Sequence, residues 1–143
     1  MKLVSIALFV VAALLYAARS QADPLRADHP LIGAWKLELP NLHCQETYRI
    51  RKEGTISVTS AEEVAESEFV ISDKPSAKGF YKWVDKVVKD NGKKDCAGEL
   101  TQIGHESTNY ILLHPTGNMF LLCEKEDANT CVGPLVRQKG GDT

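Results

Sequence analysis

The sequence predicts an all-β protein, an antiparallel up-and-down β-barrel of about eight strands, stapled by two disulfides. Short runs in which apolar and polar residues alternate recur roughly every dozen residues. Turn-forming residues separate these runs, so that consecutive strands form hairpins. The chain also carries four cysteines, which suit covalent staples in a small exported domain. A meander of hairpins favours a barrel, because closure removes the exposed edges of the sheet.

The N-terminus has the pattern of a secretory signal peptide. Met1 and Lys2 give a positive start, Leu3–Ala18 is almost wholly apolar, and Ser20 and Ala22 offer small residues to a signal peptidase. The apolar block is shorter than the roughly 20 residues that span a bilayer, although a retained membrane anchor is the alternative. Cleavage after Ala22 would remove 22 of the 143 residues and leave 121, the size of one domain.

The charge of the mature chain excludes some partners. Removing Lys2 and Arg19 leaves 15 basic residues against 19 acidic ones, a formal charge of −4. A mildly acidic, evenly mixed surface argues against nucleic acid or an anionic membrane as partner. We expect no membrane span in the mature chain. The sequence contains no Asn-x-Ser/Thr sequon, which fits a secreted protein of the bacterial periplasm.

The four cysteines predict two disulfides. Cys123 and Cys131 flank a turn-like segment, so they could face each other across a hairpin. That pairing leaves Cys44 with Cys96, and a bridge that closes about 50 residues would stabilise the fold by about 4 kcal/mol. A metal site is the alternative, but the chain has no Cys-x-x-Cys pair.

The first half of the chain contains the clearest strand pattern. After a flexible lead-in over residues 23–30, Trp35 and Leu37 in residues 31–40 alternate with Lys36 and Glu38. Further strands follow, each with its own alternation. They are expected over residues 44–51, with Cys44, Glu46, Tyr48 and Ile50 on one face, and after the turn 52–55, where Ile56 and Val58 alternate with Ser57 and Thr59.

Two segments are ambiguous between helix and strand. Residues 61–66 contain helix-forming residues, and we expect a bend there before a strand that includes Phe69 and Ile71. Phe80–Asp90 has apolar residues at helical spacing, but its aromatic and β-branched residues favour a strand, with Tyr81 and Trp83 on one face. We prefer the strand.

The second half predicts hairpins to the end of the domain. Asn91-Gly92 indicates a hairpin turn, and the returning strand is expected over Cys96–Ile103. Three more strands are expected over residues 108–114, 119–124 and 130–138. The domain would thus span residues 31–138 and end in a disordered tail, residues 139–143.

Gly33-Ala34-Trp35 resembles the Gly-x-Trp motif that opens lipocalin-like (calycin) barrels. In that family an arginine on or after the last strand packs over the tryptophan, and Arg137 is placed to match it. The resemblance implies that Gly33, Trp35 and Arg137 close the barrel. A weaker resemblance, carried by the spacing of Trp35 and Cys44, is to small periplasmic inhibitors of secreted metalloproteases. It implies that residues 23–29 would plug a protease cleft.

The sequence shows no catalytic signature, and we expect a protein that is not an enzyme. The histidines are scattered, no nucleophile motif or phosphate-binding glycine loop occurs, and paired cysteines cannot act as nucleophiles. The acidic run Glu62–Glu68 could hold calcium, but a solvated face explains it better. We expect no metal and no cofactor.

The leading hypothesis is a secreted, non-enzymatic lipocalin-like protein that binds a small apolar or amphipathic ligand. The candidate cavity residues are Tyr48, Phe69, Trp83, Tyr110 and Leu112. One alternative is a periplasmic inhibitor or immunity-type protein with a protein target. Another is an envelope protein with a filled core and no ligand. An open interior of about 300 Å³ or more would favour the first hypothesis.

Overall fold

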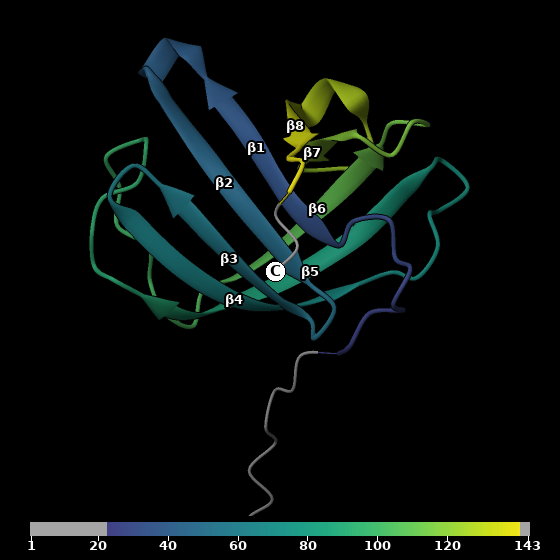
Figure 1. Cartoon of the computed structure of the whole chain (residues 1–143), viewed down its shortest axis with the longest axis horizontal. Coiled ribbons are helices and arrows are strands. Elements are labelled where there is room, and N and C mark those ends of the chain that lie inside the picture. The colour runs from purple at the N-terminus through teal and green to yellow at the C-terminus, as the bar shows by residue number, and fades with distance from the viewer. Residues whose placement is uncertain (1–22, 141–143) are drawn as a thin grey trace, which may run out of the picture.

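The computed structural model describes residues 23–140, and within them eight strands form one closed antiparallel barrel (Figure 1). The predicted signal peptide, residues 1–22, and the last residues, 141–143, lie outside the described residues. The strands are β1 (Gly33–Leu39), β2 (Cys44–Arg51), β3 (Thr55–Ser60), β4 (Glu63–Ile71), β5 (Phe80–Asp90), β6 (Glu106–Leu113), β7 (Met119–Cys123) and β8 (Cys131–Arg137).

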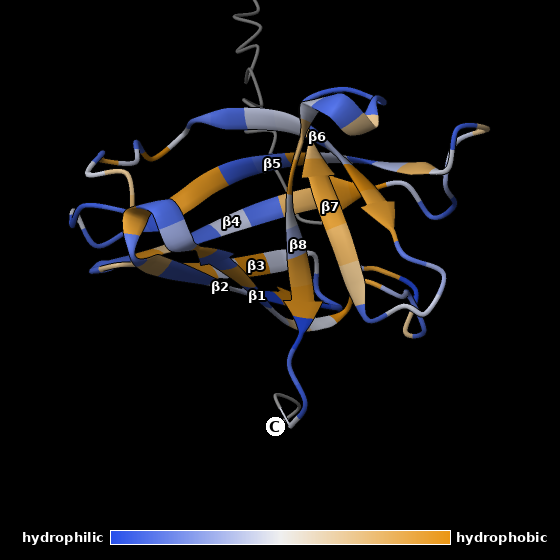
Figure 2. Ribbon diagram, turned by 90° about the horizontal axis from the view of Figure 1, so that it is seen from above, coloured by the Kyte–Doolittle hydropathy of each residue, from blue (hydrophilic) through white to orange (hydrophobic). Residues whose placement is uncertain are grey.

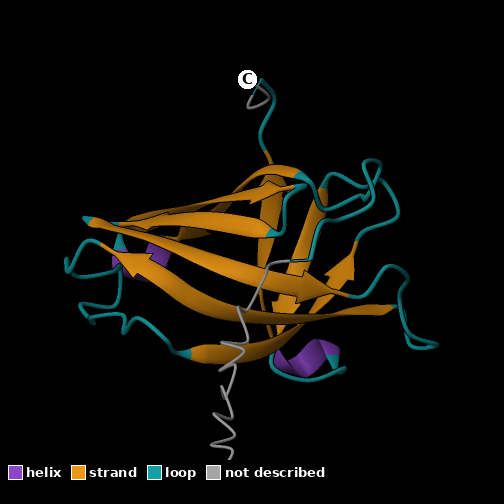
Figure 3. Cartoon of the chain, turned by 90° about the horizontal axis from the view of Figure 1, so that it is seen from below, coloured by secondary structure: helices purple, strands orange, loops and turns teal. Residues whose placement is uncertain are grey.

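Each strand pairs with the next in sequence, and β8 returns to pair with β1. In this closing pair Trp35 lies opposite Arg137 and Leu37 opposite Leu135. The all-β barrel predicted from the sequence is therefore confirmed, with no free sheet edge among its strands. Two short 3₁₀ turns, η1 (Pro40–Leu42) and η2 (Ala128–Thr130), are the helical elements of the described chain (Figure 3). None of its helices is long and apolar enough to cross a bilayer.

The barrel has two different ends. We call one the closed end, where residues 25–32 pack beneath the strands beside the β2–β3 and β6–β7 turns. We call the other the disulfide end, because Cys44–Cys96 and Cys123–Cys131 both lie there. Both predicted pairings are confirmed, with Cα–Cα distances of 5.9 Å and 3.9 Å.

The strand alternation places a continuous hydrophobic core inside the barrel. Trp35, Phe69 and Leu135 are among the side chains that are almost completely buried. Hydrophobic residues are also concentrated along β7 and β8 (Figure 2). The core consists of Leu31, Trp35, Leu37, Ile50, Ile56, Phe69, Trp83, Ile111, Phe120 and Leu135.

The returning strand predicted over Cys96–Ile103 is wrong. Residues 91–105 form a long loop at the disulfide end instead of a tight hairpin. The Asp95 carboxylate accepts hydrogen bonds from the backbone N–H groups of Ala97 and Glu99, and Gly98 has a φ of +78°. These local turns, together with the bridge from Cys96 to β2, stop the segment from extending.

The helix-forming residues after Ala61 form part of β4, which is longer than expected. The strand begins at Glu63, and its inward positions carry Glu63, Ala65, Ser67 and Phe69. Pairing with β3 on one side and β5 on the other supplies ladder hydrogen bonds that outweigh weak helical preferences. The strand preferred for Phe80–Asp90 is confirmed as β5.

Candidate ligand cavity

A cavity of about 200 Å³ lies inside the barrel. All strands except β1 contribute to its wall, so the closed sheet itself makes the site. The lining residues are Tyr48, Ile50, Ile56, Val58, Ser67, Trp83, Asp85, Ser107, Asn109, Phe120, Leu122 and Leu135.

The apolar part of the wall is made of tightly packed rings and aliphatic side chains. Trp83 stacks on Phe69, with ring centroids 4.6 Å apart and an interplanar angle of 25°. Phe120 meets the buried Trp35 edge to face, with centroids 4.7 Å apart. Because aromatic side chains have few rotamers, these ring contacts fix the shape of the cavity wall. A ligand would therefore meet a largely preformed apolar surface.

The polar part of the wall surrounds the Asp85 carboxyl group. Ser67, Ser107 and Asn109 line the cavity together with it. Burial raises the pKa of Asp85, whereas hydrogen bonds donated by the Ser67 hydroxyl and the Trp83 indole N–H act in the opposite direction. Asp85 is the charged residue among those that line the cavity, so the site combines one acidic group with an apolar wall.

A chain of hydrogen bonds connects the cavity to the disulfide end. The Tyr48 hydroxyl donates to one carboxylate oxygen of Glu46 at 2.5 Å, and the Ser60 hydroxyl donates to the other at 2.7 Å. Ser60 in turn accepts the backbone N–H of Cys96 at 3.0 Å. Burial and the neighbouring Glu46 raise the pKa of Tyr48, which keeps its phenol protonated. The bridged loop is thus tied to the cavity wall.

Two more acidic groups lie near this end. Glu63 is 4% exposed, and its pKa is raised first by burial, with Asp90 acting in the same direction. Glu63 Oε1 and Asp90 Oδ2 are buried side-chain atoms without a hydrogen-bond partner. Together with Asp85 and Glu46, they make the inside of the disulfide end acidic. The described residues hold no group of three or more metal-ligating side chains placed to bind an ion.

The closed end is sealed by Arg137. Its guanidinium carbon lies 4.1 Å from the centroid of the Trp35 ring. The same group donates to the carbonyl oxygens of Pro30 and Ile32, on the segment before β1, and of Gly117, on the β6–β7 turn. The barrel-closing geometry expected for Trp35 and Arg137 is therefore present in the structure.

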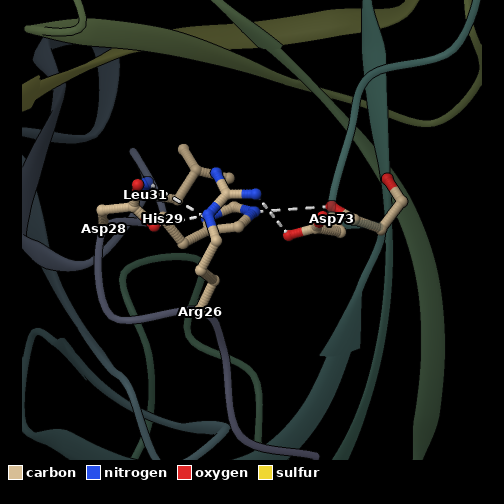
Figure 4. Close-up of polar contacts among 6 residues, drawn as sticks. Arg26, Asp28, His29, Leu31 and Asp73 are labelled. Carbon is tan, nitrogen blue, oxygen red and sulfur yellow. Dashed lines mark hydrogen bonds and ion pairs between the residues drawn. The ribbon is translucent and has the colours of Figure 1, made fainter.

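The segment before β1 is docked at the closed end, which differs from the flexible lead-in expected for residues 23–30. His29 is 4% exposed and meets Tyr81 edge to face. Arg26 forms ion pairs with Asp28 and Asp73, so it joins this segment to the β4–β5 connection (Figure 4).

The five predicted cavity residues do not all lie at the cavity. Tyr48 and Trp83 line it, and Phe69 is buried directly behind Trp83. Tyr110 and Leu112 lie on the other face of β6, in surface grooves, which corrects their predicted inward orientation. The sequence from Tyr110 to Leu113 is apolar at every position, so alternation could not indicate which face is inside.

The polar cavity residues were missed by the sequence analysis. Ser107 and Asn109 lie on the same face of β6 as the buried Ile111. On β5, Asp85 is two residues after the buried Trp83 and shares its face. The spacing of two residues between these polar residues and the core residues could have indicated that they face the interior. Comparison of the chain with protein-family models, curated proteins and solved structures gave no match.

Proposed function

We propose that this chain is a secreted, lipocalin-like binding protein whose barrel holds one small amphipathic molecule without transforming it. The observation that carries the proposal is the internal cavity, which has rings and aliphatic groups on most of its wall and a hydrogen-bonding cluster around Asp85. An apolar pocket with a few convergent polar groups and a perturbed pKa is typical of a ligand site.

The volume of the cavity limits the ligand. At about 200 Å³ it does not reach the roughly 300 Å³ that would favour a ligand-binding barrel, so the proposal is restricted to a small ligand. A dry cavity of roughly 150 Å³ is large enough to hold benzene. The ligand is therefore about the size of one ring with a short substituent, not a long lipid chain.

The docked N-terminal segment favours ligand binding over the inhibitor alternative. Residues 23–29 would have to extend freely to enter a protease cleft. Instead, the Leu25 N–H donates to the Lys52 carbonyl oxygen at 2.7 Å, and His29 is buried. Releasing the segment would expose His29 and remove Leu25 from its packing against the core.

Ligand-observed NMR with benzyl alcohol tests the proposal. Val58 lines the cavity, whereas Val70 is 47% exposed on the outer face of β4. We expect benzyl alcohol to bind the wild-type protein and the control Val70→Phe, and the cavity-filling Val58→Phe to remove binding. Cooperative thermal unfolding of both variants would confirm that they are folded. Equal binding to Val58→Phe and the wild type, or no binding to the wild type, would contradict the proposal.

A further inference from the structure

We propose that the ligand is a small organic amine whose ammonium group pairs with the Asp85 carboxylate while its apolar body occupies the cavity. The inference rests on the proposed function and specifies its chemistry. Asp85 places a carboxyl group in a cavity wall that also contains aliphatic side chains such as Ile50 and Leu135.

Asp85 takes part in none of the ion pairs found among the described residues, and the histidine whose charge acts on it, His105, is exposed on the β5–β6 loop. The ion pairs found among the described residues involve other carboxylates: Asp28, Asp73, Glu38 and Glu66. The cavity wall contains no lysine or arginine. A half-buried carboxylate without a lysine or arginine beside it costs free energy, and a ligand ammonium group would reduce that cost by supplying both charge and hydrogen bonds.

The polar neighbours of Asp85 suit an ammonium group. An ammonium has several N–H donors and no acceptor, so it needs several oxygen acceptors around it. The hydroxyls of Ser67 and Ser107 and the side-chain carbonyl of Asn109 can accept, and all three residues line the same cavity as Asp85.

The acidic residues around the cavity also disfavour an anionic ligand. Burial is the main cause of the raised pKa of the Tyr48 phenol in the cavity wall. Glu46, Glu63 and Asp85 raise this pKa further, so their fields all reach this part of the interior. A ligand carboxylate would enter this negative potential without a basic residue on the wall to bind it. Small carboxylic acids are therefore disfavoured as ligands, and amines are favoured.

Three probes of nearly equal size separate these possibilities: benzylamine, benzyl alcohol and benzoate. For the wild-type protein at pH 7 we expect benzylamine to bind about tenfold tighter than benzyl alcohol or better, and benzoate to bind at least about tenfold weaker than benzyl alcohol. Asp85→Asn should remove most of the difference in affinity between benzylamine and benzyl alcohol. The matched control is Asp23→Asn, which removes an exposed carboxylate.

The outcomes distinguish the amine from the cavity itself. If benzyl alcohol binds as tightly as benzylamine, the amine inference is overturned and the proposed function stands. If none of the probes binds, both are overturned. If Asp85→Asn does not fold, ¹³C NMR titration of Asp85 in the wild type decides. Benzylamine should lower the Asp85 pKa and benzyl alcohol should not. The other ionisable groups of this region, Tyr48, Glu46, Glu63 and His105, are the same in both samples. An unchanged Asp85 pKa would contradict the pairing.

Discussion

The Arg137 guanidinium lies 4.1 Å from the centre of the Trp35 ring, and the two residues are direct partners in the β1–β8 pair. One side chain therefore joins the first and last strands and also binds three backbone carbonyl oxygens at the closed end. Trp35 completes the arrangement, because its indole N–H donates to the Leu31 carbonyl oxygen at 2.9 Å. The closed end of the barrel thus depends on two residues that are about 100 positions apart in the sequence.

Replacing Arg137 by lysine should destabilise the protein by about 2 kcal/mol, although the charge is retained. Lysine lacks the planar fork that reaches several carbonyl oxygens at once and stacks on an indole. Urea unfolding measures the change. Arg51→Lys is the control, since Arg51 donates to the Ser57 hydroxyl on the barrel wall and its loss should cost less than about 0.5 kcal/mol. Similar stabilities for Arg137→Lys and Arg51→Lys would contradict the sealing role.

Gly33→Ala should cost about 2–3 kcal/mol. Gly33 has a φ of +133°, and an added Cβ would lie 2.8 Å from a guanidinium nitrogen of Arg137. The control, Gly92→Ala, has a positive φ of +70° but no atom within 4 Å of the added Cβ, so it should cost about 1 kcal/mol. Thermal or urea unfolding measures both. Equal losses would show that the contact with Arg137 contributes nothing beyond backbone strain.

The two disulfides should differ in their contribution to stability. In the chain-entropy treatment, removing Cys44–Cys96, which closes 52 residues, costs about 4 kcal/mol, and removing Cys123–Cys131, which closes 8, costs about 2.5 kcal/mol. Double serine variants compared by urea unfolding test this order. Amide hydrogen exchange should also increase over residues 91–105 in Cys44→Ser/Cys96→Ser and remain unchanged there in the other variant. A reversed order would mean that residual structure in the unfolded chain dominates.

His29 should make stability depend on pH. Burial lowers the pKa of His29, and its Nδ1 faces the Leu31 backbone N–H at 3.3 Å, which requires the neutral ring. The folded state therefore favours neutral His29. The contribution of His29 to the free energy of unfolding is complete above its ordinary pKa of about 6.5 and is lost as the pH falls below that value. Urea unfolding at pH 7.5 and pH 5 should show this loss. In His29→Gln the difference between the free energies of unfolding at the two pH values should be smaller. His105→Gln, at an exposed position, is the control and should retain the wild-type difference.

Several parts of the fold could be predicted because they follow from local patterns. Trp35 and Leu37 alternate with charged residues, so β1 has one inward face in any sheet that buries it. Cys123 and Cys131 flank a short turn, which brings them together once a hairpin forms. The loop at Cys96–Ile103 was mistaken for a strand. It contains the apolar residues Leu100 and Ile103, but in the structure these side chains are 62% and 65% exposed. No local pattern distinguishes an apolar residue that stays outside from one that is buried.

The sequence alone predicted an all-β barrel, most of its strands and turns, the cysteine pairing and, through a family resemblance, the contact between Trp35 and Arg137. The tertiary structure decided which face of β6 lies inside, and so replaced Tyr110 and Leu112 with Ser107 and Asn109 in the cavity wall. It also placed Asp85 inside the cavity. The physical reason is that the inward face of a strand depends on its register with its neighbours, and that register is set by contacts between residues far apart in the chain.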